Sequence, residues 1–161
     1  MIIKTQLTRK DFVQVNLILL YKRFTPKLLT IGGIVFLALF IFAGGFNSPH
    51  FNASTLLAPV FMMGILPFVT FLTARSNYSS NKRITETIEY EFGNDNLAIK
   101  GESFSSQLSW NKIYKVSKLK NFILIFQTKQ IANVIPRRDV WEGDITKLKE
   151  ILDSHNVKNN L

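Results

Sequence analysis

The sequence predicts an α+β membrane protein, in which a two-helix transmembrane hairpin is followed by a small β-barrel or sheet with a C-terminal helix. Three observations support this fold class. Two long apolar runs without charge lie close together in the first half of the chain. Alternating apolar and polar residues begin after residue 83. The last segment then returns to the spacing of an amphipathic helix.

The hairpin is predicted from residues 28–46 and 55–74, which contain no charged side chain. Because an α-helix rises about 1.5 Å per residue, each run reaches across the roughly 30 Å hydrocarbon core of a bilayer. A core helix of a soluble protein would show a polar face, and neither run has one. The polar residues 47–54 between the runs are expected to form a short extracytoplasmic loop. The two runs should therefore form an antiparallel pair of transmembrane helices.

Basic residues flank both runs and set the expected orientation. They are Arg9, Lys10, Lys22, Arg23 and Lys27 before the first run, and Arg75, Lys82 and Arg83 after the second. The short loop carries no Lys or Arg, so both termini are expected on the cytoplasmic side. The runs also lack the ionisable side chains that transporters generally place in their spans, which disfavours transport. A pore formed by several copies stays open as an alternative.

Residues 1–27 are expected to form a cytoplasmic strand followed by an amphipathic helix. Residues 2–7 have strand character, and Thr8 and Asp11 have the spacing of a capping box, which marks a helix start. Phe12 and Val15 begin an apolar side of that helix. This side could lie on the inner membrane surface or pack on the soluble domain, and the sequence leaves both possibilities open.

A cytoplasmic domain is predicted over residues 75–161. Its six expected strands fall within residues 84–92, 97–99, 104–110, 114–116, 122–126 and 131–135. Apolar residues at helical spacing between Trp141 and Leu152 predict a terminal helix, and the polar residues 156–161 are expected to fray. A short meander of strands needs a cover, and this helix is the available one. Strands capped by a C-terminal helix are the plan of a pleckstrin-homology-like domain.

Several motifs resemble the YcxB-like family of small bacterial membrane proteins. They are Leu7-Thr8-Arg9-Lys10-Asp11-Phe12, Ser109-Trp110-x-x-Ile113, Phe122-Ile123-Leu124 and Ile135-Pro136-Arg137-Arg138. The resemblance implies two spans with a C-terminal pleckstrin-homology-like domain, and a multi-pass protein of the bacterial inner membrane. It implies no enzymatic activity and supplies no catalytic or ligand-binding residue. Trp110 and Pro136 are expected to matter for folding.

Four basic residues are candidates for contact with an anion, an acidic lipid or a partner: Lys82, Arg83, Arg137 and Arg138. The alternative is that they serve only topology and solubility. Lys112, Lys115, Lys118 and Lys120 follow one predicted strand and its turn, where lysines commonly protect a sheet edge from pairing.

Several function classes are disfavoured by composition. The chain has no cysteine and only two histidines, His50 and His155, so no metal site, cofactor or His-based catalysis is expected. The clustered serines between Ser103 and Ser109 lack a base, and no phosphate-binding loop is present. Neither nucleic acid nor a small-molecule substrate is expected as a partner. The sequence thus predicts a non-enzymatic, membrane-anchored interaction module that binds a protein partner or, weakly, anionic lipid. The alternative is an oligomeric membrane component, either a pore or an accessory subunit of a transporter.

Overall fold

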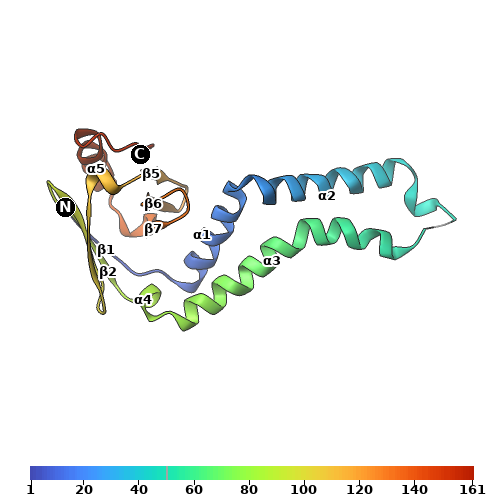
Figure 1. The fold of residues 1–161 in the computed structure, drawn as a ribbon, viewed down its shortest axis with the longest axis horizontal. Helices are drawn as coiled ribbons and strands as arrows, with labels where there is room; N and C mark the ends of the chain where they lie inside the picture. The colour runs from blue at the N-terminus through green and yellow to red at the C-terminus, as the bar shows by residue number, and fades with distance from the viewer. Residues whose placement is uncertain (50) are drawn as a thin grey trace. The chain divides into compact units, whose positions relative to one another are not determined.

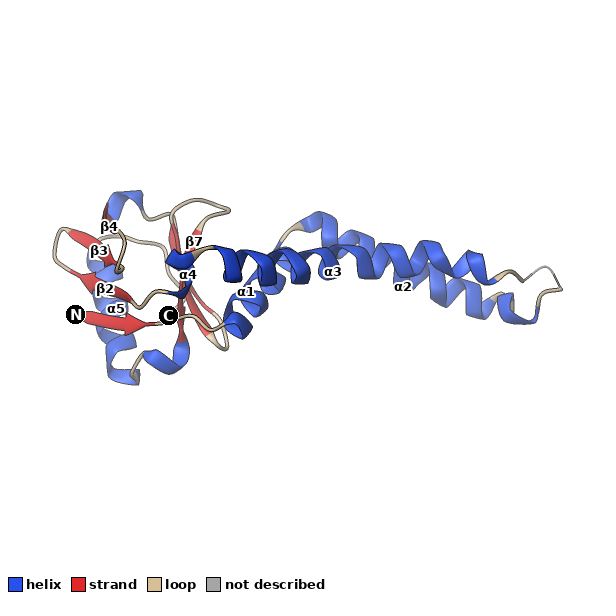
Figure 2. Cartoon of the chain, turned by 90° about the horizontal axis from the view of Figure 1, so that it is seen from below, coloured by secondary structure: helices blue, strands red, loops and turns tan. Residues whose placement is uncertain are grey.

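The computed structural model describes residues 1–49 and 51–161, so His50 lies outside the described residues. The chain divides into two compact units, one of residues 12–77 and one that combines residues 1–11 with residues 78–161. Figures 1 and 2 show the helices of the first unit and the two sheets of the second. The second unit is therefore built from segments that lie before and after the first unit in the sequence.

The helical unit contains most of α1 (Arg9–Lys22), then α2 (Phe24–Phe42) and α3 (Leu57–Ser80), with short 3-10 turns η1 (Gly45–Asn47) and η2 (Ala53–Leu56) between the last two. Helices α2 and α3 lie side by side (Figures 1 and 2). Both are long and apolar enough to cross a membrane, with mean hydropathies of 2.0 and 2.1 over their most apolar stretches. The predicted pair of apolar helices is thus confirmed.

The helix bounds differ from the apolar runs. Helix α2 starts four residues before the run at 28–46 and ends at Phe42, where Gly44 takes a left-handed conformation with φ of 68°. Glycine adopts this conformation without steric cost and commonly ends helices. Helix α3 continues through Pro67 and extends to Ser80, beyond the run at 55–74. A charge-free run therefore locates a helix but does not fix its ends.

The second unit contains two antiparallel sheets, of four and three strands. The four-stranded sheet has the order β1 (Ile2–Thr5), β2 (Ile88–Phe92), β3 (Asn96–Lys100), β4 (Ser105–Ser109). The three-stranded sheet has the order β5 (Lys115–Lys118), β6 (Phe122–Phe126), β7 (Ala132–Pro136). The remaining elements are α4 (Lys82–Thr85), η3 (Trp110–Lys112), η4 (Arg137–Asp139) and α5 (Glu142–Ser154). Six strands after residue 83 and a terminal helix agree with the sequence pattern.

The N-terminal strand β1 is part of the four-stranded sheet rather than a separate N-terminal segment. Ile3 of β1 lies opposite Tyr90 of β2 in an antiparallel ladder, and the Phe92 N–H donates to the Met1 carbonyl at 2.8 Å. The sequence expectation placed residues 1–27 outside the domain at 75–161. Alternation within a single strand shows that it has a buried face, but it does not identify the neighbouring strand.

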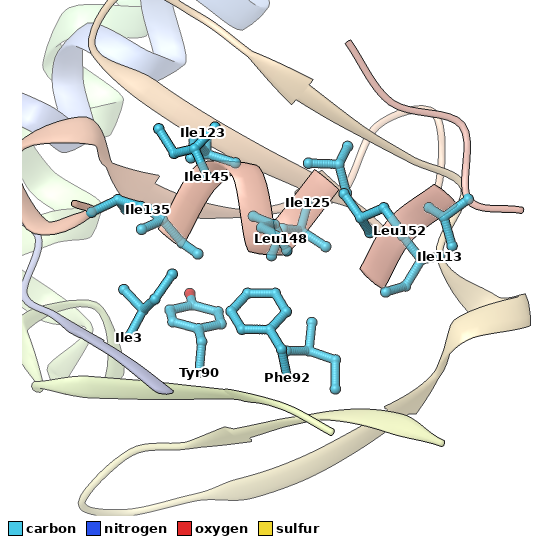
Figure 3. Close-up of a cluster of buried hydrophobic side chains, with 14 of the residues drawn as sticks. Ile3, Tyr90, Phe92, Ile113, Ile123, Ile125, Ile135, Ile145, Leu148 and Leu152 are labelled. Atoms are coloured by element: carbon cyan, nitrogen blue, oxygen red, sulfur yellow. The ribbon is translucent and has the colours of Figure 1, made fainter. Parts of the chain in front are cut away.

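The core lies between the two sheets and α5. Figure 3 shows Ile3, Tyr90 and Phe92 of the four-stranded sheet pointing toward side chains of α5 and the three-stranded sheet. Helix α5 contributes the stripe Ile145, Leu148 and Leu152, and all three side chains are buried. All five residues of β6 are buried, as expected of a strand covered on both faces. Burial also raises the pKa of the Tyr90 hydroxyl, because the phenolate is poorly solvated there.

No closed barrel forms among the described strands, so the barrel alternative is not realised. The 3-10 turn η3 separates β4 from β5, and no ladder joins the two sheets. The outer edge of β5 is already occupied. The Val116 N–H donates to the Lys158 carbonyl at 2.9 Å, and the Lys118 N–H donates to the Asn160 side chain at 2.7 Å. The backbone donors that would pair β5 with another strand are thus satisfied by the C-terminal segment.

The expectation that residues 156–161 fray is therefore wrong. After α5, Asn156 adopts φ of 55° and its N–H donates to the Asp153 carbonyl, while the Val157 N–H donates to the Leu152 carbonyl. This pair of bonds is a Schellman motif, in which a left-handed residue reverses the chain. Val157 is buried in the core as a result. The polar composition of the segment concealed these contacts.

The first strand after the helical unit also begins later than predicted. Residues 82–85 form α4, and β2 starts at Ile88. Glu86, which breaks the alternation of residues 84–92, is buried and accepts hydrogen bonds from the backbone and hydroxyl of Ser103. These bonds lower the pKa of the Glu86 carboxyl. Glu86 is therefore a buried hydrogen-bond acceptor and not part of the strand that the sequence predicted.

Candidate functional site

Two of the three candidate arginines, Arg137 and Arg138, follow the last strand directly. Strand β7 ends at Pro136, which precedes the 3-10 turn η4, and the Arg137 N–H donates to the Asn121 carbonyl at 2.9 Å. Proline cannot donate to a ladder and fixes an extended entrance to the turn. The turn places the two guanidinium groups against different parts of the same unit.

Arg138 forms a bidentate ion pair with Asp11. Its two terminal nitrogens donate to the two carboxylate oxygens at 2.9 and 2.7 Å, and one of them also donates to the Gln6 carbonyl at 3.3 Å. Planar guanidinium–carboxylate pairs of this kind are stronger and more directional than a lysine contact. Arg138 therefore ties η4 to the first turn of α1 and to Gln6 just before it.

Asp11 has further partners that hold it in place. The predicted capping box is present, since the Asp11 N–H donates to the Thr8 hydroxyl at 3.2 Å and the Thr8 N–H donates to the Asp11 carboxylate at 2.9 Å. The Asp11 residue is only 8% exposed. The hydrogen bond from Arg138, aided by those from Thr8, lowers the Asp11 pKa to about 2 despite the opposing effect of burial.

A second polar contact joins the same two segments. The Thr5 hydroxyl donates to the Asp139 carboxylate at 2.5 Å, and Thr5 is buried. Residues 5–11 and η4 are thus joined by the Arg138–Asp11 pair and by this hydrogen bond. The sequence showed the capping box, but nothing in it indicated that Asp11 would meet Arg138, because 127 residues separate them.

Arg137 also forms its contacts within the domain, but with different partners. Its guanidinium donates to the Glu142 carboxylate at 2.5 Å and to the Val140 carbonyl at 3.3 Å. Both partners lie where the chain passes from η4 into α5. Arg137 therefore fixes the start of the terminal helix.

Lys82 and Arg83 lie on α4. The Asn81 side chain caps this short helix by accepting from the Arg83 N–H at 3.1 Å. The Arg83 guanidinium lies over the Phe104 ring, 5.7 Å from its centroid, and Lys82 is exposed. The four candidates therefore belong to two separate elements. The two surface hollows described are lined by residues 149–161 and by residues of β1 and α5, and contain none of the four.

Residues 92–152 match the family model of the YcxB-like protein. Over these residues the chain is similar to YcxB-like proteins. The resemblance inferred from the sequence motifs is thereby confirmed over this range. No curated protein and no solved structure matches the chain.

The matched range includes β3 to β7 and most of α5, and it contains Arg137 and Arg138 but not Lys82 or Arg83. Strand β1 and Asp11 lie outside it, although β1 pairs with β2 and Asp11 pairs with Arg138 in the same compact unit. In the part of the chain that the structure describes, no cluster of three or more His, Asp or Glu side chains is placed to hold a metal ion.

Proposed function

We propose that this protein is a non-enzymatic, membrane-anchored interaction module of the bacterial inner membrane. Helices α2 and α3 span the bilayer, and both chain ends lie on the cytoplasmic side. There the YcxB-like domain, with a pleckstrin-homology-like plan, binds a protein partner or, weakly, anionic lipid at the membrane surface.

The outward-facing apolar surface of the helical unit carries the proposal. Phe42 is 90% exposed, and most of the large exposed apolar side chains of the chain lie on α2 and α3. A soluble protein rarely exposes contiguous apolar surface of this extent, whereas lipid tails would cover it. Glycines in α2 face the partner helix, since a Cβ at Gly33 would come within 3.1 Å of the Pro59 carbonyl oxygen.

The pleckstrin-homology-like plan is supported by the strand arrangement. A four-stranded and a three-stranded antiparallel sheet are followed by a helix that packs against both. Trp141, at the start of α5, is 76% exposed, and exposed tryptophans are frequent at protein interfaces.

The topology can be tested by cysteine labelling, because the natural chain contains no cysteine. Single variants Ser54→Cys, between the spans, and Gln107→Cys, on exposed β4, would be treated in intact cells with a membrane-impermeant maleimide. We expect Ser54→Cys to react from outside the inner membrane and Gln107→Cys to react only after permeabilisation. Equal labelling of both sites in intact cells would contradict the proposal.

A partner can be sought with a photo-crosslinking residue at Trp141 and a matched one at Thr146, which is exposed on the same helix. We expect a specific adduct from the first position only. Adducts with a second copy of the chain alone would instead favour the oligomeric membrane component.

A further inference from the structure

Charge is strongly segregated along the domain. Residues 84–102, which include β2 and β3, contain five acidic side chains and one basic one. Residues 103–138, from β4 to η4, contain seven basic side chains and no acidic one. The three-stranded sheet therefore carries charge of a single sign, which can attract an anionic surface.

Two of these seven charges are used internally, because Arg137 pairs with Glu142 and Arg138 pairs with Asp11. The other five are Lys112, Lys115, Lys118, Lys120 and Lys129. Among the described residues, none of the five lies within ion-pair distance of a carboxylate. Their charge is therefore not neutralised within the domain.

Protection of a bare sheet edge does not explain these lysines. The outer edge of β5, which carries Lys115 and Lys118, is already covered by the segment at 158–160. Lys115 instead lies over the rings of Tyr114 and Phe126, with its ammonium 5.8 and 5.2 Å from their centroids.

One end of the three-stranded sheet combines these lysines with exposed apolar side chains. The Tyr114 N–H donates to the Phe126 carbonyl at 2.8 Å, and the Gln127 N–H donates to the Ile131 carbonyl at 3.0 Å. Tyr114 and Ile131 therefore flank the end of β6 on its two sides, and they are 47% and 60% exposed. Together with Lys112, Lys115 and Lys129 they form what is called here the basic end.

We propose that the basic end docks on the surface of a bilayer that contains anionic lipid headgroups. Ammonium groups interact with such headgroups without stereospecific pairing, while tyrosine and isoleucine suit the boundary between headgroups and acyl chains. The two hollows described on the domain contain none of these residues. The inference rests on the proposed function, since the spans would keep the domain beside the bilayer at high effective concentration.

The test uses the full chain in lipid nanodiscs, with a fluorophore on Ile131→Cys or, as a control, on Gln107→Cys. Lipid-attached quenchers report contact with the bilayer surface. In discs that contain phosphatidylglycerol we expect quenching at Ile131 and little at Gln107. Discs of phosphatidylcholine alone, or high salt, should abolish the difference, because surface attraction is screened within about 10 Å.

Matched charge variants make the test specific. The triple change Lys112→Gln, Lys115→Gln and Lys129→Gln should reduce the ratio of docked to undocked domain on the order of a hundredfold, at about fivefold per lysine. The change Lys147→Gln, Lys149→Gln and Lys158→Gln removes the same charge from α5 and the segment after it, and should leave docking nearly unchanged. Tryptophan fluorescence, to which buried Trp110 contributes, checks that each variant is folded.

Quenching at Ile131 that is absent in anionic discs, or equal in neutral and anionic discs, would overturn the inference. If added polyglutamate protects the Ile131 label and lipid does not, the inference is also overturned. That result would indicate an acidic protein as the partner. If the chain does not co-elute with the discs at all, the membrane-anchored function itself fails, which is a separate result.

Discussion

The helical unit and the domain use apolar residues in opposite ways. In α2 and α3 large apolar side chains face outward, as Leu39 does with 65% exposure, whereas in the domain Leu148 is fully buried. Continuous apolar runs therefore specify the hairpin, and alternation with a period of two or a helical stripe specifies the domain. The difference teaches that an apolar residue contributes to folding in water only where a second element covers it.

The largest expected effect sharpens this contrast. Leu148→Ala should lower the free energy of unfolding of the domain by about 3 kcal/mol, because it leaves a cavity in a closed core. Leu39→Ala, on the exposed surface of α2, should leave the unfolding of the domain unchanged. Tryptophan fluorescence, to which buried Trp110 contributes, measures both variants during denaturation of the full chain in detergent. Equal destabilisation by the two changes would contradict the distinction between the buried Leu148 and the outward-facing Leu39.

A smaller effect is expected where the segment before the hairpin joins the domain. Arg138→Met should destabilise the domain by about 2 kcal/mol, because Asp11 is left mostly buried without its cation. Lys120→Met removes an equal charge at an exposed position and should cost almost nothing. If both variants unfold alike, the Arg138–Asp11 pair has no special role.

The same pair predicts a pH dependence. The folded Asp11 pKa of about 2 is below the ordinary value of about 3.9, so its contribution to stability is complete above pH 4. It should decrease as the pH falls toward 2. Asp11→Asn should therefore be less stable than the natural chain by roughly 1.5 kcal/mol at pH 7, and the difference should shrink at low pH. Denaturation curves of both chains at several pH values measure this difference in unfolding free energy. A difference that stays constant with pH would contradict the prediction.

The smallest effect concerns the segment after α5. Asn156→Gly should be neutral or slightly stabilising, while Asn156→Val should cost about 1 kcal/mol, because a β-branched residue disfavours the left-handed conformation. Hydrogen exchange at the Val116 amide should become faster in the valine variant, since that amide donates to the Lys158 carbonyl. Unchanged exchange would mean that the segment covers β5 independently of the turn.

Sequence reasoning identified the elements whose signals are local. The apolar runs, the Thr8–Asp11 capping box, the continuous apolar strand Phe122–Phe126 and the stripe on α5 each lie within a few helical turns or one strand. What it missed depends on long-range contacts. The pairing of β1 with β2 joins residues on opposite sides of the hairpin, and the Asp11–Arg138 pair does the same.

Composition misled in two places for the same reason. Residues 156–161 are mostly polar, a composition that predicts fraying, yet the Lys158 carbonyl and the Asn160 side chain satisfy β5. Glu86 interrupts an alternating pattern because its carboxylate anchors Ser103. In both cases polar atoms serve as hydrogen-bond partners inside the fold, which residue type alone does not reveal.

Strand β1, which precedes the hairpin, completes the sheet of the domain that follows it. Lys4 and Glu89 are opposite each other in the β1–β2 register, at a spacing that suits a disulfide. The double variant Lys4→Cys, Glu89→Cys, oxidised in membranes, is predicted to form an intramolecular disulfide. The pair Lys4→Cys, Lys100→Cys, whose second position lies one strand further on β3, should not. Absence of the first disulfide, or equal formation of both, would contradict the account.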